Sequence, residues 1–418
     1  MKNNQDVVVI GGGVIGLCSA YYLARQGASV TVIDQGMPGE ACSQHNAGYV
    51  APGHFVPLAS PGMFMQAVKW MFDSRSPLYL KPRLDPDLLA WSWHFMRSCS
   101  ERVMRPALPL LRDMLKESLN LYEEMSHERG FDFHLTRKGL LTVYRTEKAK
   151  LGAEHEVNLS NEIGVTASLV DEDGLRKIDP AVKFRARGGV YFPGDAHLVP
   201  ALLVKNLHDH LARDGVTFVT GQKVVGFSRS GNRIGSVRTS AAEIGGGEFV
   251  LAAGSWSHLL LRDLGIRLLL QAGKGYSITV KDPPVKPSVP CIFMERRVAV
   301  TPFASELRFA GTMEIAGVDL SITQKRVDAI LDAIPLYYED VERPDLARAQ
   351  VWKGLRPVTP DGLPYIGRFK NYPNLLAATG HAMIGISLGT VTGKLVAEIV
   401  GSRPPSHNMA LLSPDRFN

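Results

Sequence analysis

The stretch VVVIGGGVIG at residues 7–16 decides the fold of this 418-residue chain. Its first four residues form an apolar, β-branched run that is typical of a buried parallel strand. The next six residues fit the pattern G-x-G-x-x-G. In that pattern Gly11 permits a tight turn, Gly13 lets the backbone approach a pyrophosphate, and Gly16 lets a helix pack closely on the strand.

The residues that follow complete a dinucleotide-binding unit. The pattern predicts a helix over residues 14–26, which Gly27 ends, and then a strand over residues 29–33. The helix N-terminus offers free amides to the phosphates, and Asp34 can accept a hydrogen bond from a ribose hydroxyl. A glycine turn that binds nothing is the less favoured alternative, because strand, helix and acid are all present. The motif alone leaves NAD and FAD open, and its predicted binding residues are Gly11, Gly13, Val14, Ile15, Gly16, Asp34 and Gln35.

The composition is ordinary for a soluble globular protein, with 45% hydrophobic and 21% charged residues. The formal net charge of +6 suits an anionic small substrate or an acidic membrane surface. The chain has no basic run with interleaved aromatic residues, the pattern that would indicate nucleic-acid binding. The cysteines, Cys18, Cys42, Cys99 and Cys291, lack metal-ligand spacing, so we expect reduced thiols and no metal site.

The ends and the apolar runs of the chain bear on its location. The first strand begins too early to leave room for a signal peptide. No apolar run is long enough to span a bilayer. We therefore expect a cytoplasmic protein whose membrane contact, if it has one, is peripheral on the cytoplasmic face of the inner membrane.

Parallel-strand patterns occur at both ends of the chain and in its middle. We predict an α/β fold combined with an α+β one: a Rossmann-like nucleotide-binding domain, assembled from discontinuous segments, and an inserted substrate domain with an antiparallel sheet. The predicted boundaries give residues 1–50, 146–264 and 346–418 to the nucleotide-binding domain and residues 51–145 and 265–345 to the substrate domain. The ligand cleft is expected between them.

Two segments of the substrate domain give local predictions. Residues 131–144 are predicted to form a β-hairpin with Lys138 and Gly139 at or near the turn. Residues 63–72, MFMQAVKWMF, are predicted to form a helix with an apolar stripe. Core packing is the more common reason for such a stripe, and a membrane-facing or partner-facing surface is the alternative.

Four further blocks carry the polar and glycine-rich character of a ligand site. They are SQHNAG at 43–48, LAAGSW at 251–256, GLRPVTPDG at 354–362 and TGHAMIGIS at 379–387. Together with KGYS at 274–277, they resemble the motifs of the D-amino-acid oxidase and glycine oxidase superfamily. The subfamily that the chain resembles most is the bacterial D-amino-acid dehydrogenases (small subunit), and the resemblance covers nearly the whole length.

The resemblance implies an enzyme with FAD as its cofactor. Its reaction would be hydride transfer from the α-carbon of a D-amino acid to flavin N5, giving an imino acid and then a 2-oxo acid and ammonia. Cyclic substrates such as D-proline or cis-4-hydroxy-D-proline are included. The electrons would pass to a quinone or another respiratory acceptor. The alternatives are a glycine or sarcosine oxidase that uses dioxygen, and a partner-dependent flavin subunit of a heteromeric dehydrogenase.

The same resemblance suggests which residues hold the substrate. Arg356 matches the arginine of the GLRP block and can grip a carboxylate through two parallel hydrogen bonds. Its alternative role is a salt bridge between domains. Tyr276 is expected to contact the carboxylate or the amine, against the alternative of a strand tyrosine in the core. His381 is expected to line the flavin or the substrate, against the alternative of a structural histidine.

Two positions depart from the patterns of related proteins. Met383 stands where glycine oxidase-like proteins often carry a second arginine, which makes the pocket more apolar. His45 lies where some related dehydrogenases attach flavin covalently, although non-covalent FAD is the favoured expectation. The remaining residues expected to contact FAD are Ser43, Gln44, His45, Asn46, Ala47, Gly48, Val224, Ala253, Gly254, Trp256, Gly354, Arg356, Gly380, Met383, Ile384, Gly385, Ile386 and Ser387.

Overall fold

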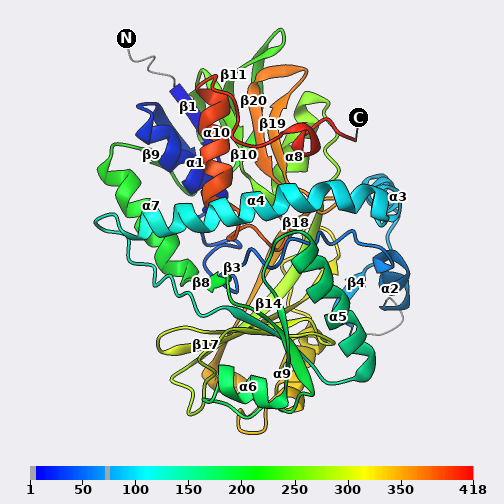
Figure 1. Cartoon of the computed structure of the whole chain (residues 1–418). Coiled ribbons are helices and arrows are strands. Elements are labelled where there is room, and N and C mark those ends of the chain that lie inside the picture. Colours follow the sequence, from blue (N-terminus) through cyan, green and yellow to red (C-terminus); the bar gives the residue numbers. More distant parts are fainter. Residues whose placement is uncertain (1–5, 71–75, 418) are drawn as a thin grey trace.

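The fold is that of a computed structural model, which describes residues 6–70 and 76–417. Two large sheets lie at opposite ends of the molecule, and helices cross the region between them (Figure 1). The first, here called the parallel sheet, consists in spatial order of β19 (Tyr365–Phe369), β20 (Tyr372–Thr379), β13 (Glu248–Leu251), β1 (Asp6–Ile10), β2 (Ser29–Ile33) and β9 (Thr217–Val219).

Strand β1 lies between β13 and β2 in the parallel sheet, and both of its faces are covered. Val7 and Val9 pack into the core beneath the helices α1 and α10, whereas Val8 and Ile10 belong to the core on the opposite face. This burial on both sides explains why the strand is a continuous apolar run instead of an alternating one. The flanking helices are α1 (Val14–Arg25), α7 (Pro200–Arg213) and α10 (Gly389–Val400) on one face, and α8 (Ser257–Leu261) on the other.

Glycines set the close approach of these elements. An ideal Cβ on Gly16 would lie 1.8 Å from the carbonyl oxygen of Gly11, so only glycine lets α1 begin this close to β1. A Cβ on Gly393 would lie 2.4 Å from the carbonyl oxygen of Cys18, which explains how α1 and α10 can cross closely. The first and last parts of the chain are thereby joined in one core.

The second sheet, here called the mixed sheet, forms the opposite end of the molecule. Helix α9 (Gln324–Tyr337) buries one face of it, and the other face is directed toward the parallel sheet. Most neighbouring strands are antiparallel, while β5 and β15, and β4 and β17, are parallel. The order is β18 (Ala349–Val358), β14 (Gln271–Lys281), β17 (Glu306–Ile315), β16 (Val298–Pro302), β15 (Cys291–Phe293), β5 (Leu140–Tyr144), β7 (Gly188–Phe192) and β6 (Ser168–Asp171), with β4 (Leu78–Leu80) beside β17.

The long helix α4 (Glu101–Ser126) crosses the waist of the molecule between the two sheets (Figure 1). Its buried residues, among them Leu111 and Leu115, share a core with α10 and with α5 (Glu147–Glu162). The remaining α-helices and strands are α2 (Met63–Trp70), α3 (Pro86–Ser98) and α6 (Glu172–Ile178), the strand pair β3 (Tyr49–Val50) and β8 (Ala196–His197), and the small sheet β10 (Val224–Ser230), β11 (Arg233–Thr239) and β12 (Glu243–Gly245).

The predicted α/β plus α+β fold is confirmed, with differences in detail. The hairpin predicted over residues 131–144 is wrong, because β5 pairs with β15 and β7 and the residues before it make only one bridge, Thr136 to His197. Phe131 and Phe133 instead pack into the core around α1. The end of the predicted helix 63–72 lies outside the described residues.

The sheets also divide the chain differently from the predicted domain boundaries. Strands β6, β7 and β18 lie in the mixed sheet, although the boundaries gave their residues to the nucleotide-binding domain. Strand partners depend on contacts far apart in sequence, which local composition does not encode. Over the part of the chain that the structure describes, no helix is both long and apolar enough to cross a bilayer.

Candidate active site

A cavity of about 980 Å³ lies between the two sheets and receives residues from both. Most of the predicted cofactor and substrate residues line it, from Gly11 at the nucleotide end to Arg356 and Met383 on the side of the mixed sheet. The predicted residues that do not line it are Gly16, Gln44, Gly48 and Gly380. The cavity therefore joins the glycine motif to the later blocks, as the sequence predicts for a single ligand site.

The nucleotide end is built from backbone groups and one half-buried acid, Asp34. Gly11 has φ of +110°, and a Cβ there would lie 2.4 Å from the carbonyl oxygen of Ala252, so the turn requires glycine. The two Asp34 oxygens accept hydrogen bonds from the amides of Gly12 and Gly36 at 2.7 and 2.9 Å. Burial nevertheless raises the pKa of Asp34. Each oxygen keeps a lone pair that can accept a ribose hydroxyl.

The loop 43–48 folds over the start of helix α1. The Ser43 hydroxyl accepts the Val14 amide at 2.9 Å, which satisfies one free donor of the helix N-terminus. The His45 ring stacks on Trp352 with ring centroids 5.0 Å apart. Burial, and then the charge of Arg308, lower the pKa of His45, which keeps its imidazole neutral near pH 7.

Arg308 holds this loop and was missed by the sequence analysis. Its guanidinium donates to the carbonyl oxygens of Asn46 at 2.7 Å and Gln44 at 3.2 Å. Burial lowers its pKa to about 10. Arg308 lies in an apolar strand without a recognisable motif, so only the register of the mixed sheet reveals that it faces the loop.

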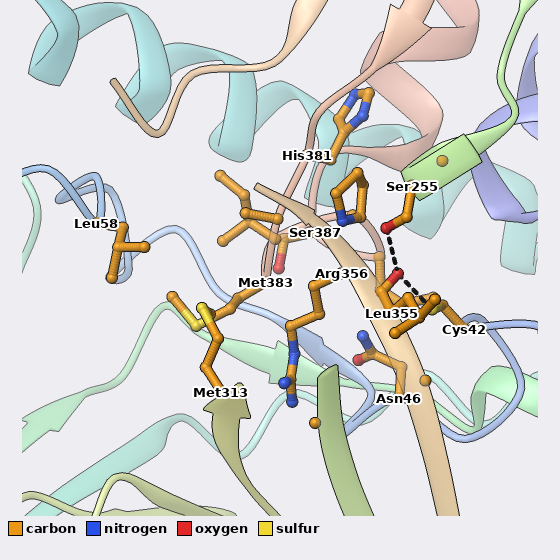
Figure 2. A pocket seen from close by; sticks show the side chains of 18 of the residues that line it. Cys42, Asn46, Leu58, Ser255, Met313, Leu355, Arg356, His381, Met383 and Ser387 are labelled. Carbon is orange, nitrogen blue, oxygen red and sulfur yellow. Dashed lines mark hydrogen bonds between the residues drawn. The ribbon is translucent and has the colours of Figure 1, made fainter. Parts of the chain in front are cut away.

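Arg356 lies on β18 and projects into the cavity (Figure 2). Gly275 on the neighbouring strand leaves it room, since a Cβ there would lie 1.7 Å from an Arg356 guanidinium nitrogen. The guanidinium donates to the carbonyl oxygen of Thr312 at 2.8 Å. Within residues 6–70 and 76–417 no carboxylate lies within salt-bridge distance of it, and burial lowers its pKa. The site therefore contains a half-buried cation with an open place for an anion.

The side chain of Tyr276 is directed to the opposite face of the mixed sheet. Its hydroxyl donates to Glu314 at 2.5 Å and accepts the amide of Thr323 at 3.1 Å. Its ring belongs to the core beneath α9, and burial raises its pKa. The structure thus does not bring this hydroxyl to Arg356, and it places Tyr276 in the alternative role of a core tyrosine.

The imidazole of His381 is directed toward helix α10. Its Nε2 lies 3.0 Å from the hydroxyl of Thr392, and burial lowers its pKa to about 3. Figure 2 shows the His381 ring and the Arg356 side chain pointing in opposite directions. His381 lines the cavity as a neutral residue, and its contact with α10 fits the structural alternative.

Apolar side chains surround the guanidinium of Arg356 on one side. Met313 and Met383 lie next to it, with Leu58 beyond them, and Asn46 lies on the other side (Figure 2). Met63 and Trp70 of α2 extend this apolar lining. Met313 and Leu58 were not singled out from the sequence, because an apolar residue in a strand or loop carries no signal of the cavity it faces.

Comparisons with known proteins agree with this architecture. The profile of the family described as DAO, FAD dependent oxidoreductase, matches residues 6–399. The D-amino acid dehydrogenase of Xanthobacter autotrophicus is 34% identical over 98% of this chain and 99% of its own length. That of Rhizorhabdus wittichii is 34% identical over 99% of this chain and 100% of its own length.

Solved structures confirm the fold. Glycine oxidase from Geobacillus kaustophilus matches with a TM-score of 0.78 and 22% identity over 99% of both chains. L-proline dehydrogenase from P. horikoshii matches with a TM-score of 0.73 and 19% identity over 99% of this chain and 98% of its own. Of the two cofactors that the glycine motif left open, FAD is confirmed. The chain belongs to the family of FAD-dependent oxidoreductases.

Proposed function

We propose that this protein is an FAD-dependent dehydrogenase of D-amino acids whose carboxylate binds Arg356. The observation that carries the proposal is the half-buried Arg356 guanidinium, which lines the cavity with no carboxylate partner among the described residues. A cation that is partly removed from water is stabilised by an anion or by several acceptors. The names of the full-length relatives, D-amino acid dehydrogenase, support the choice of substrate.

The residues present fit FAD. The Gly11 turn is too tight for a side chain, and the Gly13 backbone has open space for a pyrophosphate. Asp34 is half-buried, with oxygens that can accept a ribose hydroxyl. FAD, when bound, supplies the acceptor for the hydride of the substrate α-carbon. Arg356 would fix the carboxylate and so orient the α-carbon. Tyr276 and His381 would support the site through Glu314 and Thr392.

The lining beside Arg356 favours substrates with apolar side chains. Met313, Met383 and Leu58 offer no charge and no strong hydrogen-bond donor or acceptor to a side chain. A charged side chain would lose its hydration there without compensation. We therefore propose D-amino acids with aliphatic, aromatic or cyclic side chains, D-proline and cis-4-hydroxy-D-proline included.

The test is anaerobic reduction of the bound flavin, monitored through the visible absorbance of the flavin. Holoenzyme is mixed with D-amino acids, their L-enantiomers, glycine, sarcosine and D-hydroxyproline, and air is then readmitted. Bleaching by apolar D-amino acids with slow reoxidation supports the proposal. Bleaching only by glycine or sarcosine with fast reoxidation would show an oxidase instead. No bleaching by any of them would point to a partner-dependent subunit.

We propose that FAD is held without a covalent bond and that His45 only contacts it. The stacking of His45 on Trp352 gives the ring a packing role. Acid precipitation of the holoenzyme is expected to leave the flavin in the supernatant. Flavin that stays in the pellet, and leaves it in His45→Ala, would show that this imidazole carries the cofactor.

A peripheral membrane contact through α2 and α3 is proposed for delivery of electrons to a quinone. Leu89, Trp93 and Met96 follow one another on one stripe of α3 and are 64%, 55% and 37% exposed, and Met65 of α2 is 60% exposed. Arg97 lies over the Trp93 ring at 5.9 Å and adds a positive charge. Apolar side chains next to a cation suit an anionic lipid surface. Helix α2 also lines the cavity through Met63 and Trp70.

Binding to vesicles tests this surface. Wild-type protein is expected to cosediment with vesicles that contain anionic lipid, and Trp93→Ser with Leu89→Ser is expected to lower the bound fraction severalfold, because both side chains would insert. Leu151→Ser is the matched control, since Leu151 on α5 is 69% exposed and lies outside this surface. Equal binding of all three proteins would contradict the proposal, and retention by a partner protein alone would favour a heteromeric subunit.

A further inference from the structure

Thr312 on strand β17 has a backbone conformation that its side chain disfavours. Its φ is +58°, in the left-handed region. Among the described non-glycine residues with positive φ, it is the one with a β-branched side chain. Such a conformation is a steric outlier. It persists where the surrounding structure determines it, and such residues cluster at ligand sites.

An irregularity of the mixed sheet accounts for this conformation. The pairing of β14 with β17 shifts register between Lys274 and Tyr276, and Thr312 lies opposite that shift. Register irregularities of this kind re-aim side chains. Here the carbonyl oxygen of Thr312 accepts a hydrogen bond from Arg356 at 2.8 Å. The strained residue Thr312 is therefore hydrogen-bonded directly to the guanidinium of Arg356.

The hydroxyl of Thr312 has no partner among the described residues. The residue is 7% exposed and lines the cavity, and its Oγ1 makes no hydrogen bond. Buried hydroxyl groups are nearly always hydrogen-bonded, because leaving one unpaired costs free energy. A strained backbone and an unpaired hydroxyl in one residue, beside one guanidinium, indicate a place prepared for a ligand.

We propose that Thr312 is a substrate-binding residue whose hydroxyl donates a hydrogen bond to the carboxylate held by Arg356. This inference rests on the proposed function. The hydroxyl belongs to the same residue as the carbonyl that accepts from the guanidinium, so the two donors come from adjacent groups of the cavity lining. One N–H of Arg356 already donates to that carbonyl oxygen. The hydroxyl adds a donor to those that the guanidinium still offers. The ligand class is an α-amino carboxylate or a simple carboxylate.

The test removes the hydroxyl and keeps the shape of the side chain. Thr312→Val holoenzyme is expected to show a roughly tenfold higher KM for D-alanine and a similarly weaker binding of benzoate, followed by the change in the flavin spectrum, since a hydrogen bond to a charged group is lost. Thr312→Ser is expected to recover most of both. A raised KM for D-alanine together with unchanged benzoate binding would overturn the assignment of the hydroxyl to the carboxylate.

Matched variants separate this role from a structural one. Thr142→Val removes another buried hydroxyl that lines the same cavity without a partner, but from β5, beyond β16 and β15 in the sheet order. Its KM is expected to stay at the wild-type value. Thr312→Gly serves if Thr312→Val does not fold, because glycine accepts positive φ without strain. It is expected to bind FAD normally and still show the raised KM.

The outcomes distinguish this inference from the proposed function. If no D-amino acid reduces the wild-type flavin, the proposed function fails. If D-alanine reduces it and Thr312→Val keeps the wild-type KM, the inference alone is overturned. An equal rise in KM in Thr142→Val would also overturn it, because any buried hydroxyl would then have the same effect.

Discussion

Replacing Arg356 by lysine is expected to raise KM for D-amino acids about a hundredfold while the protein keeps its FAD. Lysine keeps the positive charge but loses the planar fork that holds a carboxylate through two hydrogen bonds. Losing such a charged, bidentate contact costs about 3 kcal/mol, and each 1.4 kcal/mol corresponds to roughly a tenfold change. Steady-state kinetics with an artificial electron acceptor, together with the ratio of flavin to protein, measure both effects.

The cavity offers a matched control for this substitution. Arg297 also lines the cavity, but it is exposed and lies in the turn between β15 and β16. Arg297→Lys is expected to leave KM within about twofold of the wild type, since an exposed side chain holds little binding energy. If Arg297→Lys raises KM and Arg356→Lys does not, Arg297 binds the carboxylate. Unchanged KM in both would remove arginine from carboxylate recognition.

Gly275→Ala checks the same site from the neighbouring strand. A Cβ on Gly275 would fall 1.7 Å from the Arg356 guanidinium, so this substitution displaces the cation without removing it. We expect KM to rise as in Arg356→Lys and the bound FAD to remain. Normal KM in Gly275→Ala, measured in the same assay, would mean that the position of the guanidinium does not matter for binding.

The sequence predicts the nucleotide end of the site well because its determinants are local. Strand β1, the Gly11 turn and helix α1 follow one another within residues 6–25, and Asp34 ends the next strand. Each of these signals comes from a few adjacent residues with a strict steric requirement. Arg356 was singled out in another way, through the resemblance of its GLRP block to a known family, and its side chain lines the cavity.

The other side of the site could not be predicted, because it depends on the register of the mixed sheet. The side chain of Tyr276 is directed toward α9, on the face of β14 opposite to Gly275 and Arg356. Thr312 and Met313 line the cavity at the register shift between β14 and β17, where β17 carries an extra residue. Arg308 on β17 contacts the loop 43–48, which is far from it in the sequence. A local pattern gives alternation along one strand, but it does not give the strand's partner or a bulge.

Alanine substitutions at two glycines of the first turn, Gly16 and Gly13, are expected to differ in their effects on stability and on FAD binding. A Cβ on Gly16 would lie 1.8 Å from the carbonyl oxygen of Gly11, so α1 would have to move away from β1. We expect Gly16→Ala to destabilise the fold by about 3 kcal/mol, as overpacking of a rigid core does, and to abolish FAD binding. Thermal unfolding of apoprotein and flavin fluorescence titration measure the two quantities.

Gly13→Ala is expected to lose FAD binding without losing stability. Its Cβ would meet only the Ser43 hydroxyl, at an ordinary 3.5 Å, so the apoprotein has room for it. The same methyl group would stand where the backbone must approach the pyrophosphate. The expected result is an apoprotein that melts at the wild-type temperature and binds FAD at least tenfold more weakly, since the lost contacts are charge-assisted hydrogen bonds. Normal FAD affinity in Gly13→Ala would show that the phosphates do not lie against this turn, whereas a large loss of stability would show that Gly13 is needed for packing, as Gly16 is.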